Sequence, residues 1–326
     1  MIVHPGKGKV VALCGGVGGA KLAFGLSKLL GSRLILIVNT GDDFEHLGLS
    51  ISPDIDTVLY TLSGLANREL GWGRQDETWN FMAALEAIGG ETWFRLGDRD
   101  LALHVERTRR LREGDTLTRI VGDFAKRFEI PATVLPMSNH PIRTMVATAD
   151  GMLPFQRYFV QQRCAPPVNG IVFKGSRAAV ASKQVLSALE SPDLRAIVIC
   201  PSNPFLSIDP ILAVPGVREH IERSSAPVVA VSPIIGGKAV KGPTDKIMAE
   251  LGVPATSDAI VRHYGGLLDG LIIDTYDERD RADLSGQVRV AQTLMKTDDD
   301  RGKLASAVLD FADQLTAMAI ARNSKQ

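Results

Sequence analysis

Cysteine is scarce in this chain of 326 residues, which contains only Cys14, Cys164 and Cys200. Three widely separated cysteines cannot build a disulfide framework or a zinc ribbon, because both need several cysteines at defined spacings. Cys14 and Cys200 also lie in apolar, strand-like runs. We therefore expect reduced cysteines that serve as core residues.

A net charge is missing as well, because 37 basic side chains balance 37 acidic ones. A neutral protein has no overall field that attracts nucleic acid or an anionic membrane, so any polyanion must be bound locally. No run reaches the eighteen apolar residues of a membrane span, and the N-terminus lacks a secretory apolar segment. We expect a cytoplasmic protein with no nucleic-acid or membrane partner.

Common catalytic and cofactor motifs are also missing. None of the six histidines falls in a serine elbow, a Cys/His arrangement or an HExxH zinc motif. An NAD-dependent dehydrogenase has an acidic residue at the end of its second strand, where it binds the ribose. In this chain the second apolar run is followed by Asn39 and Thr40, which disfavours that function. Phosphoryl-type transfer remains compatible, because it depends on positioning and charge stabilisation and not on a protein nucleophile.

Carboxylates, in contrast, are concentrated in one stretch. It follows the apolar run from Leu34 to Val38, and its four aspartates fall within fifteen positions: Asp42, Asp43, Asp54 and Asp56. Mg2+ is commonly held by one or two carboxylates together with phosphate oxygens of a substrate, so a metal-assisted phosphate site is one interpretation. The alternative is that these residues only form turns and cap a helix.

A glycine loop, Gly15 to Gly19, follows the apolar strand Val10 to Cys14 and precedes a helical pattern from Ala20 to Leu30. Backbone N–H groups at such a helix N-terminus favour an anion, and Lys21 adds a positive charge in the first turn. The string matches neither the GxGxxG fingerprint nor the P-loop, and glycines also allow close helix packing. Both interpretations stay open.

Apolar strands alternate with helical patterns on both sides of a more polar segment. This order predicts an α/β fold, with a Rossmann-like, mostly parallel sheet, helices on both faces and a mainly helical insertion. We assign 1–62 plus 168–326 to a nucleotide-binding core and 63–167 to an inserted domain that covers the substrate. The expected strands are Val10–Cys14, Leu34–Val38, Pro131–Pro136, Thr144–Ala149, Phe155–Gln161, Val168–Phe173, Ala196–Cys200, Pro227–Val231 and Gly270–Asp274. The expected helices are Ala20–Leu30, Thr78–Ala87, Leu117–Phe128, Ser182–Leu189, Ile247–Leu251 and Asp299–Arg322.

Small polar residues and lysines follow several of these strands, and together they suit a nucleotide or a diphosphate: Ser202, Asn203, Ser232, Lys238 and Lys246. Each residue alone is ordinary turn chemistry, so their shared position at one sheet edge is what favours a site. The basic run from Arg107 to Arg112 lies between Glu106 and Glu113, which favours a solvated helix face.

Six segments, in chain order, closely resemble the 2-phospho-L-lactate transferase family (CofD and FbiA) of coenzyme F(420) biosynthesis. They are VVALCGGVGGAKL, VNTGDDFEHLGLSISPDIDTVLYTLSG, GWGRQDETW, RLGDRDLA, CPSNPFLSIDPIL and SPIIGGKAVKGPTDK. The resemblance implies a Mg2+-dependent transfer of a phosphorylated three-carbon acid from a guanosine diphosphate-linked donor to the terminal ribityl hydroxyl of the deazaflavin Fo, with release of GMP. It also suggests a homodimer.

The resemblance assigns roles to residues. Asp42 and Asp56 would be catalytic and, with Asp43, would lie near Mg2+. The Fo contacts would be Asp56, Thr57, Arg95 and Arg99. The nucleotide contacts would be Gly15, Gly16, Gly18, Gly19, Lys21, Asn39, Ser202, Asn203, Ser232, Lys238 and Lys246. Candidates to cover the flat deazaflavin are Trp72, Trp79 and Trp93, although aromatic core packing is the alternative for at least two of them.

Donor identity stays open at this point, because the acid can be phospholactate, phosphoenolpyruvate or phosphoglycerate. Phe44 and His46, beside the acidic pair, are the first positions to inspect for donor choice. A regulatory nucleotide- or sugar-nucleotide-binding protein of related fold is the competing hypothesis.

Overall fold

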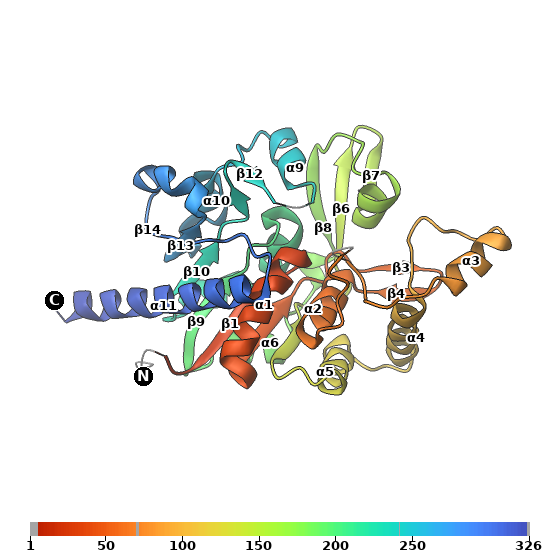
Figure 1. Ribbon diagram of the computed structural model, residues 1–326, viewed down its shortest axis with the longest axis horizontal. Helices are drawn as coiled ribbons and strands as arrows, with labels where there is room; N and C mark the ends of the chain where they lie inside the picture. The colour runs from red at the N-terminus through yellow and green to blue at the C-terminus, as the bar shows by residue number, and fades with distance from the viewer. Residues whose placement is uncertain (1–5, 70–71, 241, 325–326) are drawn as a thin grey trace.

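The computed structural model describes residues 6–69, 72–240 and 242–324, and its centre is a seven-stranded sheet (Figure 1). Each pair of neighbouring strands runs parallel. In spatial order the strands are β14 (Gln287–Val290), β13 (Gly270–Ile273), β10 (Val228–Val231), β9 (Leu194–Ile199), β1 (Lys9–Cys14), β2 (Leu34–Val38) and β5 (Thr133–Pro136). The predicted α/β fold with a parallel sheet is confirmed.

The strand order reverses between β1 and β9. From β1 the chain builds outward through β2 and β5, and from β9 it builds in the opposite direction through β10, β13 and β14. At such a reversal, the loops after the two adjacent strands run in opposite directions and leave a crevice between them. Open α/β sheets bind their ligands in this crevice, at the carboxyl ends of the strands.

Helices cover both faces of the sheet. Alternate residues of β1 divide between two cores, with Val10 and Ala12 in one and Val11 and Leu13 in the other. Strands buried on both faces are apolar throughout, which explains the continuous apolar runs in the sequence. The first core includes α1 (Gly16–Leu30), α2 (Pro53–Ser63), α5 (Leu117–Arg127) and α11 (Asp298–Asn323). The second includes α6 (Lys183–Leu189), α7 (Asp209–Leu212), α8 (Val217–Arg223), α9 (Thr244–Glu250) and α10 (Ser257–Tyr264).

The closing helix α11 lies beside α1 and extends past the edge of the sheet (Figure 1). Its segment Asp298–Arg322 is, among the described residues, the one helix long and apolar enough to cross a membrane by length and composition. Its apolar residues from Leu304 to Leu315 pack into the first core. A Cβ on Gly25 of α1 would lie 2.1 Å from the Arg301 carbonyl oxygen, so the two helices touch through backbone.

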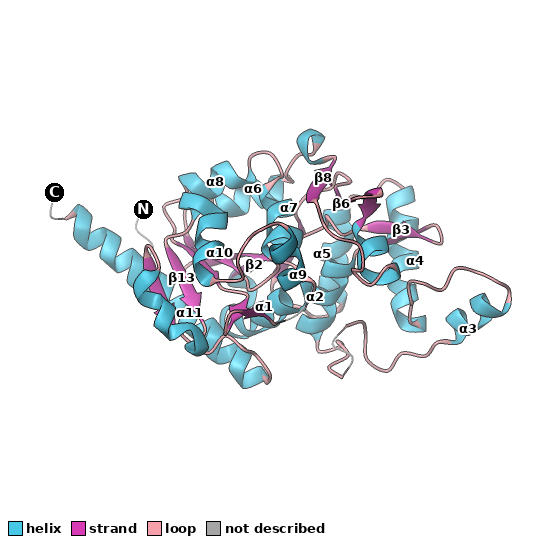
Figure 2. Ribbon diagram, turned by 90° about the horizontal axis from the view of Figure 1, so that it is seen from above, coloured by secondary structure: helices cyan, strands magenta, loops and turns pink. Residues whose placement is uncertain are grey.

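Smaller elements lie beyond one end of the sheet. They are the hairpin β3 (Phe44–His46) and β4 (Leu49–Ile51), the helices α3 (Asn80–Ala87) and α4 (Asp98–Arg112), and the antiparallel sheet of β6 (Arg143–Thr148), β7 (Gly151–Pro154) and β8 (Gly170–Lys174). Figure 2 shows α3 at the far end of a projecting loop. The division into a core and an insertion stays a prediction, but β5, which falls inside 63–167, belongs to the central sheet.

Two expected elements differ from the structure. The segment Phe155–Gln161 is not a strand, because Arg157–Gln161 forms a π-helical turn. The glycine loop is not a loop, because α1 already begins at Gly16. Here the glycines serve close packing: a Cβ on Gly18 would lie 2.5 Å from the Pro201 carbonyl oxygen.

Candidate active site

A cleft of about 830 Å3 lies at the reversal between β1 and β9. Many predicted site residues line it: Gly15, Gly16, Gly18, Lys21, Asp42, Asp56, Thr57, Arg95, Ser202, Asn203 and Ser232. Others are absent from its lining among the described residues: Gly19, Asn39, Asp43, Arg99, Lys238 and Lys246. The sheet therefore brings most, but not all, of the predicted residues to one place.

The N-terminus of α1 forms one wall of the cleft. The Gly16 amide donates to the Asp54 carboxylate at 2.8 Å, and the Gly15 amide donates to Ser202 Oγ at 3.2 Å. The amides of Val17 and Gly18 also lie in the first turn, where helix geometry provides no intrahelical acceptor. These two amides are suited to an anion at the positive end of the helix dipole.

Asn39, predicted to contact the nucleotide, is fully buried beneath this wall. Its side-chain amide donates to Asp54 at 2.9 Å and to the Leu206 carbonyl at 3.2 Å, and its side-chain oxygen accepts from Gly41 N at 2.7 Å. Asn39 therefore connects the loop after β2 to the start of α2 and to the segment after β9.

Asp42 and Asp43 are both buried, and they differ in their partners. Asp43 accepts a hydrogen bond from Ser52 at 2.8 Å. Oδ1 of each aspartate has no hydrogen-bond partner within the described part of the chain, and Asp42 lines the cleft. Burial, together with the nearby Asp54 carboxylate, raises the pKa of Asp42 well above its usual value. A buried carboxylate oxygen without a donor, on a residue that lines a cleft, fits a hard cation such as Mg2+.

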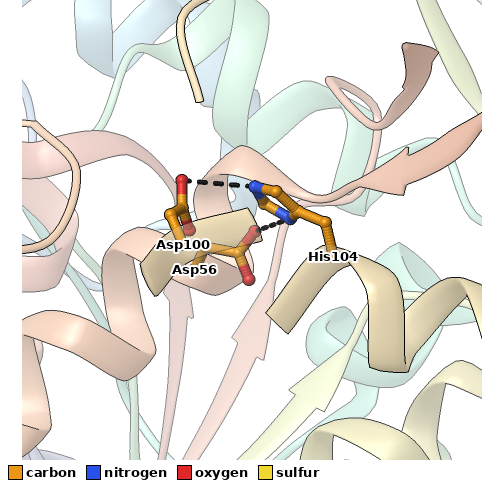
Figure 3. A group of neighbouring side chains, drawn as sticks. All are labelled: Asp56, Asp100 and His104. Carbon is orange, nitrogen blue, oxygen red and sulfur yellow. Dashed lines mark ion pairs between the residues drawn. The ribbon is translucent and has the colours of Figure 1, made fainter. Parts of the chain in front are cut away.

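Asp56, at the start of α2, belongs to a buried ionic network. Both of its carboxylate oxygens accept from Arg107 of α4, with Nη1 at 3.1 Å from Oδ2. Figure 3 shows the His104 ring between two carboxylates, with Nδ1 at 3.7 Å from Asp56 and Nε2 at 3.2 Å from Asp100. Asp100 also accepts from the Tyr60 hydroxyl at 2.5 Å. Burial raises the pKa of Asp56 although Arg107 and His104 oppose that effect.

The interpretation of Arg107 as part of a solvated helix face is wrong, because its side chain is completely buried. Arg109 does lie on the exposed face, where it pairs with Glu106 and Glu113. Sequence spacing contained a signal for the difference: Asp100, His104 and Arg107 recur every three or four residues and therefore share one face of α4.

Two of the family-like segments cap each other's helices. The Glu77 carboxylate accepts from the amides of Arg99 and Asp100, at 2.7 and 2.8 Å, at the start of α4. Asp98 in turn accepts from the amides of Asn80 and Phe81, at 3.1 and 3.0 Å, at the start of α3. This reciprocal capping fixes the N-terminus of α4, and with it the position of Asp100.

Aromatic side chains form a second wall of the cleft. Trp72 and Trp93 line it, whereas Trp79 is absent from its lining among the described residues and packs 4.2 Å from the Arg95 guanidinium. Phe44 and His46 lie behind this wall, with the His46 ring centroid 5.0 Å from that of Trp93. Any influence of Phe44 and His46 on donor choice would therefore be exerted through Trp93 and Phe94, which both line the cleft.

The sequence did not predict a further wall of the cleft, which is formed by the π-helical segment Arg157–Gln161 and the residues next to it. Phe155, Phe159 and Arg163 line the cleft there, and the two phenyl rings stack with centroids 5.4 Å apart. Their interpretation as a strand concealed this wall, because it made them part of a sheet.

Three of the predicted cationic contacts lie elsewhere. Lys246 donates to Glu250, to the Tyr158 hydroxyl and to the Pro166 carbonyl, so its ammonium connects α9 to the segment after the π-helical turn. Lys238 is exposed on β12 (Lys238–Ala239), and Arg99 is exposed, 4.0 Å from Asp76. Lys241, within the predicted nucleotide stretch, lies outside the described residues.

Comparisons with known proteins agree with the resemblance seen in the sequence. A family profile described as 2-phospho-L-lactate transferase CofD matches residues 10–310. The chain is 42% identical over 319 residues to the phosphoenolpyruvate transferase of Streptomyces griseus subsp. griseus, a match that covers 95% of this chain and 100% of the relative. It is 38% identical over 329 residues to the phosphoenolpyruvate transferase of Mycobacterium marinum, covering 93% and 98%.

Among solved structures, protein BH3568 from Bacillus halodurans superposes with a TM-score of 0.62 at 19% identity, covering 93% of this chain and 99% of that one. This likeness concerns the fold alone. The family match over residues 10–310 and the identity to curated transferases show more: the chain belongs to the 2-phospho-L-lactate transferase CofD family and is a transferase of a phosphate-containing group.

Proposed function

We propose that this protein transfers a phosphorylated three-carbon acid from a guanosine diphosphate-linked donor to the terminal ribityl hydroxyl of Fo, in coenzyme F(420) biosynthesis. The names of its curated relatives favour phosphoenolpyruvate over phospholactate and phosphoglycerate as the acid. One observation carries the proposal: a single cleft joins a helix N-terminus, an aspartate with a buried oxygen that has no partner among the described residues, and aromatic walls. An anion, a cation and a flat ring system each have a suitable surface there.

The donor's diphosphate would bind at the first turn of α1, where the amides of Val17 and Gly18 and the Lys21 side chain line the cleft. Asp42 would hold Mg2+, with Asp43 behind it and Asp56 on the acceptor side. When bound, Mg2+ would neutralise diphosphate oxygens and stabilise the charge that develops on GMP as it leaves.

Asp56 would orient the ribityl hydroxyl and accept its proton. The hydroxyl oxygen forms a bond to the phosphorus that carries the three-carbon acid, and the bond from that phosphorus to the oxygen bridging to GMP breaks. GMP takes the bonding electron pair, and the acid remains linked to Fo through a phosphodiester. Thr57 and Arg95 line the same cleft as Asp56 and are the proposed contacts of the Fo side.

Turnover with three synthetic donors tests the proposal. The purified protein, Fo and Mg2+ are mixed with the guanosine diphosphate-linked form of each acid, and product masses are compared. We expect the enolpyruvyl product to form fastest, together with one GMP per product. If none of the three donors yields a product linked to Fo, the proposed function is incorrect.

Binding measurements separate this function from that of a regulatory nucleotide-binding protein. Trp72 and Trp93 line the cleft, so Fo should quench tryptophan fluorescence, and GDP should strengthen that quenching. A regulatory protein would bind GDP without any effect of Fo. The expected homodimer rests on the family resemblance and is checked by light scattering, and the cytoplasmic location stays a prediction from composition.

A further inference from the structure

The buried Arg107, which pairs with the cleft residue Asp56, has no role in the proposed function. It is fully buried, and both of its terminal nitrogens reach the Asp56 carboxylate. Nη1 also lies 3.2 Å from the Ser50 carbonyl and 3.3 Å from His104 Nδ1. Arg107 therefore contacts the strand before Asp56, Asp56 itself and a neighbour on its own helix.

A metal centre is the competing explanation for this cluster. Ligand atoms of Asp56, Asp100 and His104 lie within 4.8 Å of one another, which would suit an ion. However, Asp56 already gives both oxygens to a guanidinium, and a second cation at that distance would be repelled by Arg107 in a buried setting. The charge arrangement therefore favours a fixed hydrogen-bond network at this position.

Such a network determines where the Asp56 carboxylate points. A bidentate pair with arginine fixes both the position and the plane of a carboxylate, which a single lysine contact does not do. His104 restricts the same carboxylate from the other side, and Asp100 and Tyr60 restrict His104. Asp56 lines the cleft while its supporting partner Arg107 is absent from the lining among the described residues.

We propose that Arg107 is a positioning residue that holds the Asp56 carboxylate in the orientation required for transfer to the acceptor hydroxyl. This inference rests on the proposed function. At metal sites, the outer-shell partners that orient a ligand typically contribute about 10- to 100-fold to activity, and we expect the same order of effect for Arg107. Arg107→Met should lower kcat within that range and leave the KM for the guanosine diphosphate-linked donor unchanged, because the donor binds at α1.

Arg110 provides a matched control on the same helix. It also makes two ion pairs, to Asp115 at 2.7 Å and Asp123 at 2.8 Å, and it is absent from the cleft lining within the described ranges. The same Arg-to-Met change at Arg110 should leave kcat nearly unchanged, because the ion-pair partners of Arg110, Asp115 and Asp123, are absent from the cleft lining among the described residues. Arg107→Lys should recover part of the activity, because one donor remains.

A double-variant cycle separates positioning from mere support of the fold. In the Asp56→Asn background, Arg107→Met should cause little further loss of kcat. The double variant should also have a higher thermal midpoint than Asp56→Asn alone, because it no longer contains a buried, unpaired arginine charge. If Arg107→Met alone is poorly folded, the double variant, with neither charge, and Arg107→Lys still provide the comparison.

Three results would overturn the proposal. Equal kcat in Arg107→Met and Arg110→Met would show that Arg107 only supports the fold. Losses at Asp56 and Arg107 that multiply would show that Arg107 does not act through Asp56. Absence of any turnover in the unaltered protein would instead overturn the proposed function, and this role with it.

Discussion

Four aspartates within fifteen positions occupy four different environments. Asp54 holds the Gly16 amide and Asn39, Asp56 pairs with Arg107, Asp43 accepts from Ser52, and Asp42 retains an oxygen without a partner in the described part of the chain. A buried carboxylate is stabilised only by its partners, so the partners, and not the residue type, decide which aspartate remains available to a ligand.

Asp42→Asn should remove most turnover without harming the fold. The amide keeps the shape of the side chain and removes a buried charge, so the thermal midpoint in metal-free buffer should stay equal or rise. Activity should fall by more than the about 10- to 100-fold typical of residues that only support a metal ligand. A Mg2+ titration of turnover checks this prediction, since excess Mg2+ should restore little. Full activity at ordinary Mg2+ would contradict the role of Asp42.

The buried Asp43 should make the stability of the folded protein depend on pH. Burial raises the pKa of Asp43 from 3.8 to about 7 in the folded protein, against the hydrogen bond from Ser52. A folded pKa above the unfolded value means that the protonated form is favoured on folding, so the stabilisation present below pH 3.8 is lost as pH rises through about 7.

Asp43→Asn keeps an acceptor for Ser52 and cannot ionise. Its thermal midpoint in metal-free buffer should match that of the unaltered protein near pH 4 and exceed it near pH 8. Midpoints measured across that range check the sign. A variant that is less stable at pH 8 would show that the charged carboxylate stabilises the fold.

Only some of the site residues could be identified from the sequence. The aspartates and glycines could be recognised because their local order identifies a strand end and a helix start. The spacing of Asp100, His104 and Arg107 marks one shared face of α4, but it could not show that this face is buried, because Arg107 pairs with Asp56, 51 positions away. The same holds for Lys246, whose contact with Tyr158 lies 88 positions away.

At the scale of elements, α4 is positioned by its cap. A Cβ on Gly97 would lie 2.3 Å from Cδ of Glu77, so only glycine permits the carboxylate to approach the first amides of the helix. Gly97 itself has an ordinary φ of −70°, which shows that space and not backbone strain requires glycine there. The cap therefore links the loop before α3 to the helix that carries Asp100, His104 and Arg107.

Gly97→Ala should disrupt this cap. We expect a loss of about 1–3 kcal/mol in unfolding free energy, the usual cost of forcing an extra carbon into a packed site. Turnover should fall as α4 shifts. Gly122→Ala in α5 is the control, because a Cβ there meets open space and should stabilise the helix by about 0.5–1 kcal/mol. Chemical denaturation of both variants measures the difference, and equal effects would contradict the role of the cap.

Elements with continuous apolar patterns could be predicted, and those shaped by side-chain contacts could not. Six of the seven sheet strands were recognised because burial on both faces requires apolar residues throughout. The edge strand β14 was not predicted, because its sequence QVRV is only partly apolar and partly buried. The turn at Arg157–Gln161 was mistaken for a strand because its aromatic residues have high strand propensity, whereas tertiary packing decides its backbone. The short hairpin of β3 and β4 has three residues per strand, too few for a clear alternation.

At the scale of the whole molecule, one buried ion pair joins the sheet to the last helix. Arg195 of β9 donates from Nε and Nη2 to Asp313 of α11, at 2.9 and 2.8 Å. The Arg195 side chain is 8% exposed, so loss of its partner would leave a charge with little access to water.

Asp313→Ala should therefore destabilise the protein by about 3 kcal/mol, at the low end for a broken buried pair because Asp313 is partly exposed. Lys303→Ala on the same helix removes an exposed pair with Asp299 and should cost at most about 1 kcal/mol. Unfolding of both variants in urea tests the contrast. Equal losses would mean that Arg195 finds another acceptor.

The backbone contact between α1 and α11 has a consequence for ligand binding. Gly25 packs against the Arg301 carbonyl about 11 Å along α1 from the amides of Val17 and Gly18, at a rise of about 1.5 Å per residue. A larger side chain at Gly25 would tilt α1 and displace its N-terminus from the position proposed to bind the diphosphate. In the proposed binding mode, the packing of α11 against α1 would therefore influence the affinity for the diphosphate at the first turn of α1, although α11 makes no contact with the diphosphate in that proposal.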